Sequence, residues 1–281
     1  MEQIILLGVL STALSAVHAQ SFLYSPQWGP IGYKEREKQK DATAMDTIIK
    51  ANEFQVSRII DGTTTLREGD IAVSTGRRSK ACFARSCLWS KSVDGHVYIA
   101  YSLSPDYSEM ETKQIEKGME NIEKGTCVRF VPRTHQRDYI DIQPMSGCWS
   151  YLGVRGGRQA VSLQSPQCLQ VGVISHELMH ALGFVHEQSR FDRDTYVTIM
   201  WPNIWRDRLR NFEKFKTDSL DLPYDYDSIM HFGRYSFSQD GQPTIIPKNS
   251  QIIKLGQANS LSHIDKLKIN RMYKCGDRDD N

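Results

Sequence analysis

The amino-acid sequence predicts an α+β fold for residues 79–281. One expected strand, a helix, three more strands and a second helix follow one another, and a long irregular stretch then leads to a third helix near the C-terminus. Strands and helices in runs of this kind favour the α+β class. Apolar residues make up 40% of the chain and charged residues 24%, as in ordinary globular proteins. A net charge of +2 is too small to favour a nucleic-acid-binding protein.

The first half of this domain contains the expected strands. Val97–Tyr101 is the first of them. Glu109–Lys124 is expected to be an amphipathic helix, because Ile115, Met119 and Ile122 are spaced by four and three residues. The further expected strands are Cys127–Val131, Tyr139–Ile142 and Gln159–Leu163, the last of them after the Gly156-Gly157 breaker.

Two more helices are expected in the second half. One runs from about Val171 to Leu182. The other begins at Ser262, because a serine followed three residues later by an acidic residue, here Asp265, is typical of a helix start. Apolar residues at positions 264, 267 and 272 continue this C-terminal helix.

The N-terminal residues predict a secretory signal peptide, residues 1–19. An apolar run from Ile4 to Val17 ends in small residues at Val17 and Ala19, three and one before a cut. The run is too short for a comfortable membrane span, and no later segment is long and apolar enough for one. We therefore expect a secreted, extracellular protein without a membrane anchor.

Residues 20–78 are expected to form a pro-segment. They contain no cysteine and many charges, and a short helix is plausible from about Thr43 to Ile59. The section is too small and polar to hold a core alone, so it is expected to depend on the domain that follows.

The cysteines indicate disulfides in the domain. An even number outside the cytosol suggests three bridges, and the sequence leaves 15 pairings open. The six are Cys82, Cys87, Cys127, Cys148, Cys168 and Cys275.

The segment HELMHALGFVH, residues 176–186, contains a candidate zinc site. His176 and His180 are four residues apart, which on a helix places both imidazoles on one face. Two ring nitrogens about 2 Å from a shared ion fit a tetrahedral Zn²⁺ site. Glu177 lies beside the first histidine and can hold a water molecule and take its proton, so it is the candidate catalytic residue.

Gly183 and His186 complete the candidate site. The chain must leave the helix sharply to bring a third ligand to the ion, and glycine allows the positive φ that such a helix end needs. His186 is then the third nitrogen ligand. Three protein ligands leave one position open, which is the catalytic arrangement rather than the closed structural one. We expect one Zn²⁺ per subunit.

A methionine turn is expected downstream of this motif. The extended histidine motif followed by such a turn is the metzincin signature. Met230 is expected to form the hydrophobic floor beneath the zinc. His231 is expected to be a packed or hydrogen-bonded histidine, because three histidines already suffice as ligands.

These residues resemble the astacin family of secreted zinc endopeptidases. Residues 184–194, FVHEQSRFDRD, look like that family's extended signature. The resemblance covers roughly 79–275 and implies a two-lobed metzincin domain. Its upper lobe would hold a twisted sheet and the zinc helix, and its irregular lower lobe would end in the C-terminal helix. Shorter similarities lie at Arg129-Phe130, Asp138-Tyr139-Ile140, Ser150-Tyr151-Leu152-Gly153 and Gly156-Gly157.

The resemblance also implies the disulfide pairing. The first pair is similar to that of the six-cysteine, hatching-enzyme-like branch of the family. The implied bridges are Cys82–Cys87, Cys127–Cys275 and Cys148–Cys168.

Two acidic residues acquire roles from the resemblance. Glu187 looks like the residue that meets the new N-terminal ammonium in mature astacins. Asp70 is similar to the pro-segment aspartate that caps the zinc in the proenzyme. Cleavage after Arg77 or Arg78 by an activating trypsin-like protease would release Asp70 and create the new N-terminus.

One position departs from the family pattern. The family usually has tyrosine two residues after the turn methionine, where its phenol stabilises the transition state, but this chain has Phe232. Tyr235 is close in sequence but is not shown to reach the metal. The resemblance implies a zinc endopeptidase, made as a proenzyme, that hydrolyses extracellular protein or peptide substrates. The alternative is a weakly active or inactive astacin-like binding protein, which only Phe232 favours.

Overall fold

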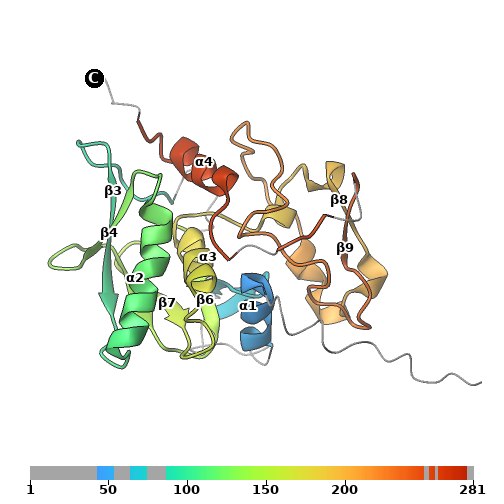
Figure 1. Ribbon diagram of the computed structural model, residues 1–281, viewed down its shortest axis with the longest axis horizontal. Helices are drawn as coiled ribbons and strands as arrows, with labels where there is room; N and C mark the ends of the chain where they lie inside the picture. Colours follow the sequence, from blue (N-terminus) through green and yellow to red (C-terminus); the bar gives the residue numbers. More distant parts are fainter. Residues whose placement is uncertain (1–42, 54–63, 75–86, 250–252, 257–258, 277–281) are drawn as a thin grey trace, which may run out of the picture.

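The computed structural model describes residues 43–53, 64–74, 87–249, 253–256 and 259–276. It confirms the predicted α+β class, with a seven-stranded sheet and a separate two-stranded sheet. Figure 1 shows β3, β4 and α2 at one end of the molecule, β8 and β9 at the other, and α3 and α1 between them. The expected signal peptide, the Arg77-Arg78 cleavage site and Cys82 lie outside the described residues.

The main sheet contains all four expected strands and three that were not predicted, β1, β2 and β6. The strand order is β1-β2-β6-β7-β5-β3-β4. The last four strands in this order, β7, β5, β3 and β4, run parallel to one another. β6 pairs antiparallel with β7 and was missed because it is only four residues long. The strands of the domain are β3 (Val97–Leu103), β4 (Val128–Pro132), β5 (Tyr139–Gln143), β6 (Cys148–Tyr151) and β7 (Arg158–Leu163).

The N-terminal segment adds two further strands and a helix to this domain. β2 (Ile71–Ser74) pairs parallel with β6, and β1 (Thr64–Arg67) pairs antiparallel with β2, so the segment forms one edge of the sheet. α1 (Ala44–Asn52) contacts α3 and β6. This helix begins as predicted, with Thr43 as its cap, but ends at Asn52; residues 54–59 of the predicted helix lie outside the described part of the chain.

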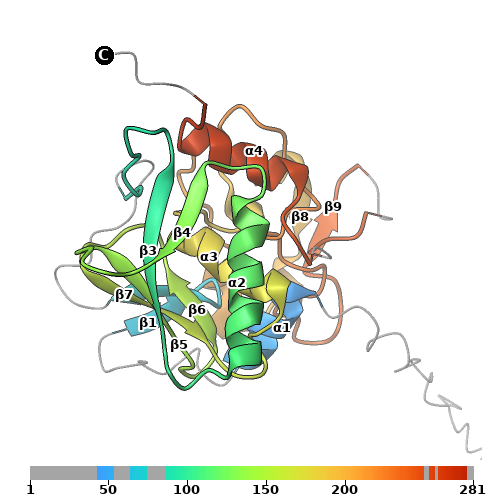
Figure 2. The same ribbon diagram turned by 60° about the vertical axis from the view of Figure 1, so that its left-hand side comes forward.

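α2 (Glu109–Glu123) and α3 (Val171–Ala181) confirm the two predicted helices and pack against each other beside the sheet (Figure 2). Gly118 permits their close approach, since a Cβ there would lie 2.3 Å from Cγ2 of Ile174. Every residue of α3 from Gly172 to Ala181 is buried. A helix that is buried all round can present polar side chains only to an internal site.

The rest of the chain is largely irregular and ends in the predicted C-terminal helix, α4 (His263–Met272), which Ser262 caps. Disulfides join Cys127 to Cys275 and Cys148 to Cys168, as expected. Among the described residues, none of the helices has the length and apolar character needed to span a bilayer. The remaining elements are η1 (Glu187–Ser189), η2 (Arg193–Thr195), β8 (Val197–Ile199), η3 (Trp201–Asn203), η4 (Arg206–Phe212) and β9 (Ile245–Pro247).

Candidate metal centre

Three histidines from two consecutive segments converge at the C-terminal end of α3. His176 and His180 lie one turn apart on the helix, and both are fully buried. Gly183 follows the helix with φ of +101°, a left-handed conformation that suits glycine. This turn redirects the chain so that His186, at the start of η1, meets the other two histidines.

Each histidine is oriented through its Nδ1 atom. Nδ1 of His176 lies 2.8 Å from the carbonyl oxygen of Ile229, and Nδ1 of His180 lies 2.7 Å from that of Phe184. A carbonyl oxygen can only accept, so these Nδ1 atoms carry the hydrogen and Nε2 keeps its lone pair. Nδ1 of His186 lies 2.7 Å from the Glu68 carboxylate, which gives the third ring the same orientation.

The Asp70 carboxylate lies at the point where the three Nε2 atoms meet. Its oxygens are 3.0 Å from Nε2 of His176, 3.4 Å from that of His180 and 3.3 Å from that of His186. Tetrahedral ligands about 2.0–2.1 Å from a shared zinc stand roughly 3.3 Å apart, so these four side chains fit the ion.

The hydrogen bonding of the site also fits a bound cation. Oδ1 of Asp70, Nε2 of His180 and both carboxylate oxygens of Glu177 are buried and have no hydrogen-bond partner among the described residues. Buried polar atoms are normally satisfied, and a cation between Asp70 and His180 would satisfy the first two of these atoms. The His176, His180, His186 and Asp70 set could therefore hold a metal ion.

Asp70 and Glu177 have opposite pKa shifts. Burial would raise the pKa of Asp70, but when the histidines are protonated, as they can be without a metal ion, the charges of His186 and His180 and hydrogen bonds from the histidines hold it well below its usual value. Burial raises the pKa of Glu177 well above its usual value, and the charge of Asp70 raises it further. A carboxyl with a raised pKa beside a metal site is a candidate general base.

A family model for Astacin, a peptidase family, matches residues 88–274. The chain belongs to the astacin family. It is 40% identical to the low choriolytic enzyme of Oryzias latipes over 246 residues, which cover 85% of this chain and 91% of that protein. It is 44% identical to high choriolytic enzyme 1 of the same species over 211 residues, which cover 75% of this chain and 78% of that protein.

The fold agrees with this assignment. The solved structure of high choriolytic enzyme 1, described as a hatching enzyme zinc-protease, superposes with a TM-score of 0.67. The match covers 70% of this chain and 98% of that one at 44% identity. This astacin-family chain is therefore a zinc metalloendopeptidase, as the sequence predicts.

The methionine turn of this astacin supports the site through its backbone. Met230 is 2% exposed, and its carbonyl oxygen accepts the N–H of Glu187 at 2.9 Å. The preceding residue, Ile229, orients His176. Asp265 on α4 accepts the N–H of Ile229 at 2.9 Å and the hydroxyl of Ser228 at 2.6 Å. The C-terminal helix thus holds the turn against the histidines.

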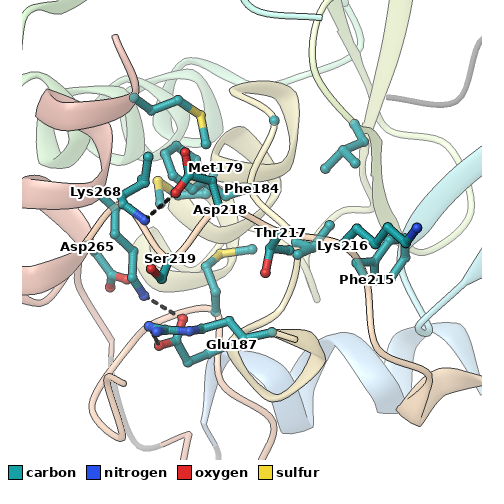
Figure 3. A pocket seen from close by; sticks show the side chains of 17 residues that line it. Met179, Phe184, Glu187, Phe215, Lys216, Thr217, Asp218, Ser219, Asp265 and Lys268 are labelled. Carbon is teal, nitrogen blue, oxygen red and sulfur yellow. Dashed lines mark hydrogen bonds and ion pairs between the residues drawn. The ribbon is translucent and has the colours of Figure 1, made fainter. Parts of the chain in front are cut away.

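Glu187 lies beside a largely apolar pocket and is already paired in this structure. Its carboxylate accepts from Lys268 at 2.5 Å, from Arg190 at 3.0 Å and from the N–H of Asp225 at 2.8 Å. Figure 3 shows Lys268 reaching from α4 to Glu187. Both side chains of this ion pair are nearly buried.

Three residues after Met230, Phe232, His231 and Tyr235, lie near the metal set in the sequence but are not part of it. Phe232 is fully buried, with its ring centroid 4.6 Å from that of His186. His231 lies outside the metal set, and its Nε2 is 2.8 Å from the hydroxyl of Tyr224. Tyr235 is 57% exposed, whereas the histidines are fully buried, so its phenol does not take the missing tyrosine's place.

Sequence reasoning missed three residues that shape the site: Glu68, Asp265 and Lys268. Glu68 precedes Gly69 and Asp70 and so looked like part of a turn. Asp265 was assigned only to the start of α4, where it also caps the helix. Of these three residues, only Lys268 could have been found from the sequence. It lies on the apolar side of the predicted C-terminal helix, and a lysine in such a position needs a buried partner.

Proposed function

We propose that this zinc endopeptidase is secreted and made as a proenzyme. Residues 1–19 would be the signal peptide, 20–78 the pro-segment and 79–281 the catalytic domain. The observation that carries the proposal is the Asp70 carboxylate, which lies 3.0–3.4 Å from the Nε2 atoms of all three histidines. It comes from a segment that the astacin family model does not cover.

The proposed roles follow from the geometry. His176, His180 and His186 hold one Zn²⁺, with Asp70 in the position that substrate and water need. Zinc, when bound, polarises the scissile carbonyl and makes water a better nucleophile near neutral pH. Glu177 accepts the proton of the attacking water and then passes it to the leaving amine. Removal of Asp70 would lower the pKa of Glu177, because the nearby negative charge would be gone.

Activation would separate the N-terminal segment from the domain. A trypsin-like protease would cleave after Arg77 or Arg78, and Asp70 would leave with β1 and β2. Glu187 would then exchange one of its present partners for the new N-terminal ammonium. The two choriolytic relatives support a proteinaceous substrate, and we propose extracellular proteins and peptides as its class.

The test measures cleavage of a short peptide and of gelatin by the intact and the trypsin-processed chain. Asp70→Ala should make the intact chain at least about tenfold more active than the intact wild type, because Asp70 no longer competes with substrate and water for the metal. A reaction barrier lower by only about 1.4 kcal/mol gives that factor. Glu177→Ala should remain inactive after processing. Absence of turnover by every processed form with zinc bound would refute the enzyme roles. An intact wild type as active as the processed one would refute latency.

A further inference from the structure

The three histidines take their Nδ1 partners from different parts of the chain. Those of His176 and His180 are carbonyl oxygens of Ile229 and Phe184, which belong to the catalytic domain itself. The partner of His186 is Glu68, which belongs to the N-terminal segment. One of the three ligands is therefore oriented by residues outside the region that matches the astacin family model.

Glu68 uses both of its carboxylate oxygens on the loop that carries His186. Oε2 accepts the Nδ1–H of His186 at 2.7 Å, and Oε1 accepts the hydroxyl of Ser189 at 2.7 Å. Glu68 is 0% exposed, as are His186 and Ser189. A carboxylate that is buried without a cationic side chain must be held by such hydrogen bonds.

The backbone around Glu68 is held in an unusual conformation. Glu68 has φ of +56°, in the left-handed region that non-glycine residues rarely adopt. The next two carbonyl groups are fixed by the domain and by α1: Asn52 donates to Gly69 O at 2.9 Å, and the N–H of Ser150 donates to Asp70 O at 3.1 Å. Such conformations persist where surrounding contacts over-determine them, and they cluster at functional sites.

Phe237 leaves little freedom for this turn. A Cβ on Gly69 would lie 3.0 Å from Cζ of Phe237, so the turn between Glu68 and Asp70 is pressed against an aromatic ring. Glu68 and Asp70 consequently approach the histidines together, one toward Nδ1 of His186 and the other toward its Nε2.

We propose that Glu68 is a positioning residue that orients His186 for zinc in the uncleaved chain. The N-terminal segment then contributes to retention of the ion in two ways, through Asp70 as a ligand and through Glu68 behind a ligand. This inference rests on the proposed proenzyme. Removing a hydrogen-bond partner behind a histidine ligand typically weakens metal affinity by about 10- to 100-fold.

The test measures the zinc dissociation constant by competition with a chelator. It uses the intact chain, its Glu68→Ala and Glu68→Gln variants, and Arg67→Ala as the matched control. Arg67 is the neighbour of Glu68 and pairs with Glu213 at 3.0 Å on the surface, away from the metal site. Glu68→Ala should raise the dissociation constant about 10- to 100-fold. Glu68→Gln should raise it less, because a neutral acceptor bonds roughly half as strongly.

Trypsin processing provides an internal control. If cleavage removes the N-terminal segment, all four processed proteins have the same sequence, and their zinc affinities should be equal. Glu68→Ala with wild-type affinity in the intact chain, or an equal loss in Arg67→Ala, would overturn the proposal. Should Glu68→Ala fail to fold, a Glu68→Gln affinity equal to that of Arg67→Ala would overturn it instead.

A different measurement shows whether the proenzyme proposal itself is wrong. In that case the intact wild type cleaves the short peptide as fast as the processed protein, whereas the affinities of the intact variants still report on Glu68. Peptide turnover and zinc affinity therefore test the two proposals independently.

Discussion

Asp265 accepts the backbone N–H of Ile229 at 2.9 Å, and this bond links the C-terminal helix to the metal site. The carbonyl oxygen of Ile229 is the partner of Nδ1 of His176, at 2.8 Å. Asp265 is fully buried and also accepts the hydroxyl of Ser228. A residue 89 positions after His176 in the sequence thus takes part in orienting it.

Asp265→Asn should destabilise the chain, because the amide replaces one of two accepting oxygens by a donor. The oxygens of Asp265 accept from the N–H groups of Ile229 and Ser262 and from the Ser228 hydroxyl, and an amide cannot accept all three at the same positions. Buried hydrogen bonds to charged groups contribute about 1.5–3 kcal/mol each, and we expect a loss in that range. Denaturant unfolding with saturating zinc measures it. Asp227→Asn is the control, since Asp227 is exposed and should change stability by less than about 0.5 kcal/mol. Equal losses in the two variants would contradict the prediction.

Phe232→Tyr should make the processed enzyme faster. The ring of Phe232 lies next to that of His186, where a phenol could stabilise the transition state of peptide hydrolysis. A preorganised donor of this kind is typically worth ~3–4 kcal/mol, so kcat should rise by about 100- to 1000-fold at most. Turnover of a peptide by trypsin-processed protein gives the measurement.

Phe191→Tyr is the matched control for that substitution. Phe191 is 49% exposed, so the variant adds the same hydroxyl to the same aromatic group on the surface, outside the buried histidine site. We expect kcat to stay within about threefold of wild type, a barrier change below 1 kcal/mol. If Phe232→Tyr also leaves kcat unchanged, the phenol has no role at this position.

The elements that could be predicted from the sequence are those with a local signal. α2 shows apolar residues at helical spacing, and α4 has a complete capping box at Ser262 and Asp265. The three histidines of the candidate site follow from spacing along one helix and a glycine turn. Local periodicity and caps decide such elements without reference to the rest of the chain.

The elements that were missed depend on distant partners. β2 consists of four residues, and its neighbour β6 lies about 80 residues further along the chain. Neither strand is long enough to show alternation that differs from a loop. Glu68 was missed for the same reason: its role depends on His186, 118 residues away, and on a left-handed backbone that no sequence pattern near it requires.

Asp141 on β5 should make stability depend on pH in acid. Burial would raise the pKa of its carboxyl, but hydrogen bonds from Ser102, Gln143 and Arg158 and the charge of Arg158 hold it below its usual value. A carboxyl with a lower pKa in the folded chain stabilises the fold above the unfolded pKa of about 3.9. That stabilisation is lost as the pH falls through the folded value.

The comparison of wild type with Asp141→Asn tests this dependence. The variant is less stable at pH 7, and the difference in thermal midpoint should shrink as the pH is lowered from 5 to 3, because the wild-type carboxylate becomes protonated. Asp227→Asn should follow the wild type across the same range. A difference that stays constant with pH would show that Asp141 acts through packing and not through its charge.

The two described disulfides should contribute unequally to stability. Cys127–Cys275 spans 148 residues and Cys148–Cys168 spans 20, and a longer loop restricts the unfolded chain more. The chain-entropy relation gives about 5 kcal/mol for the first and about 3 kcal/mol for the second, as upper values. Paired alanine substitutions compared by denaturant unfolding at saturating zinc measure both.

Cys127–Cys275 also fixes the end of α4, the helix that carries Asp265 and Lys268. Its removal should therefore lower zinc retention in addition to stability, because Asp265 helps to orient His176 through Ile229. Removal of Cys148–Cys168 should lower stability with a smaller effect on zinc. A larger loss of stability and zinc retention from the shorter loop would contradict both the loop-length argument and the link between α4 and the metal site.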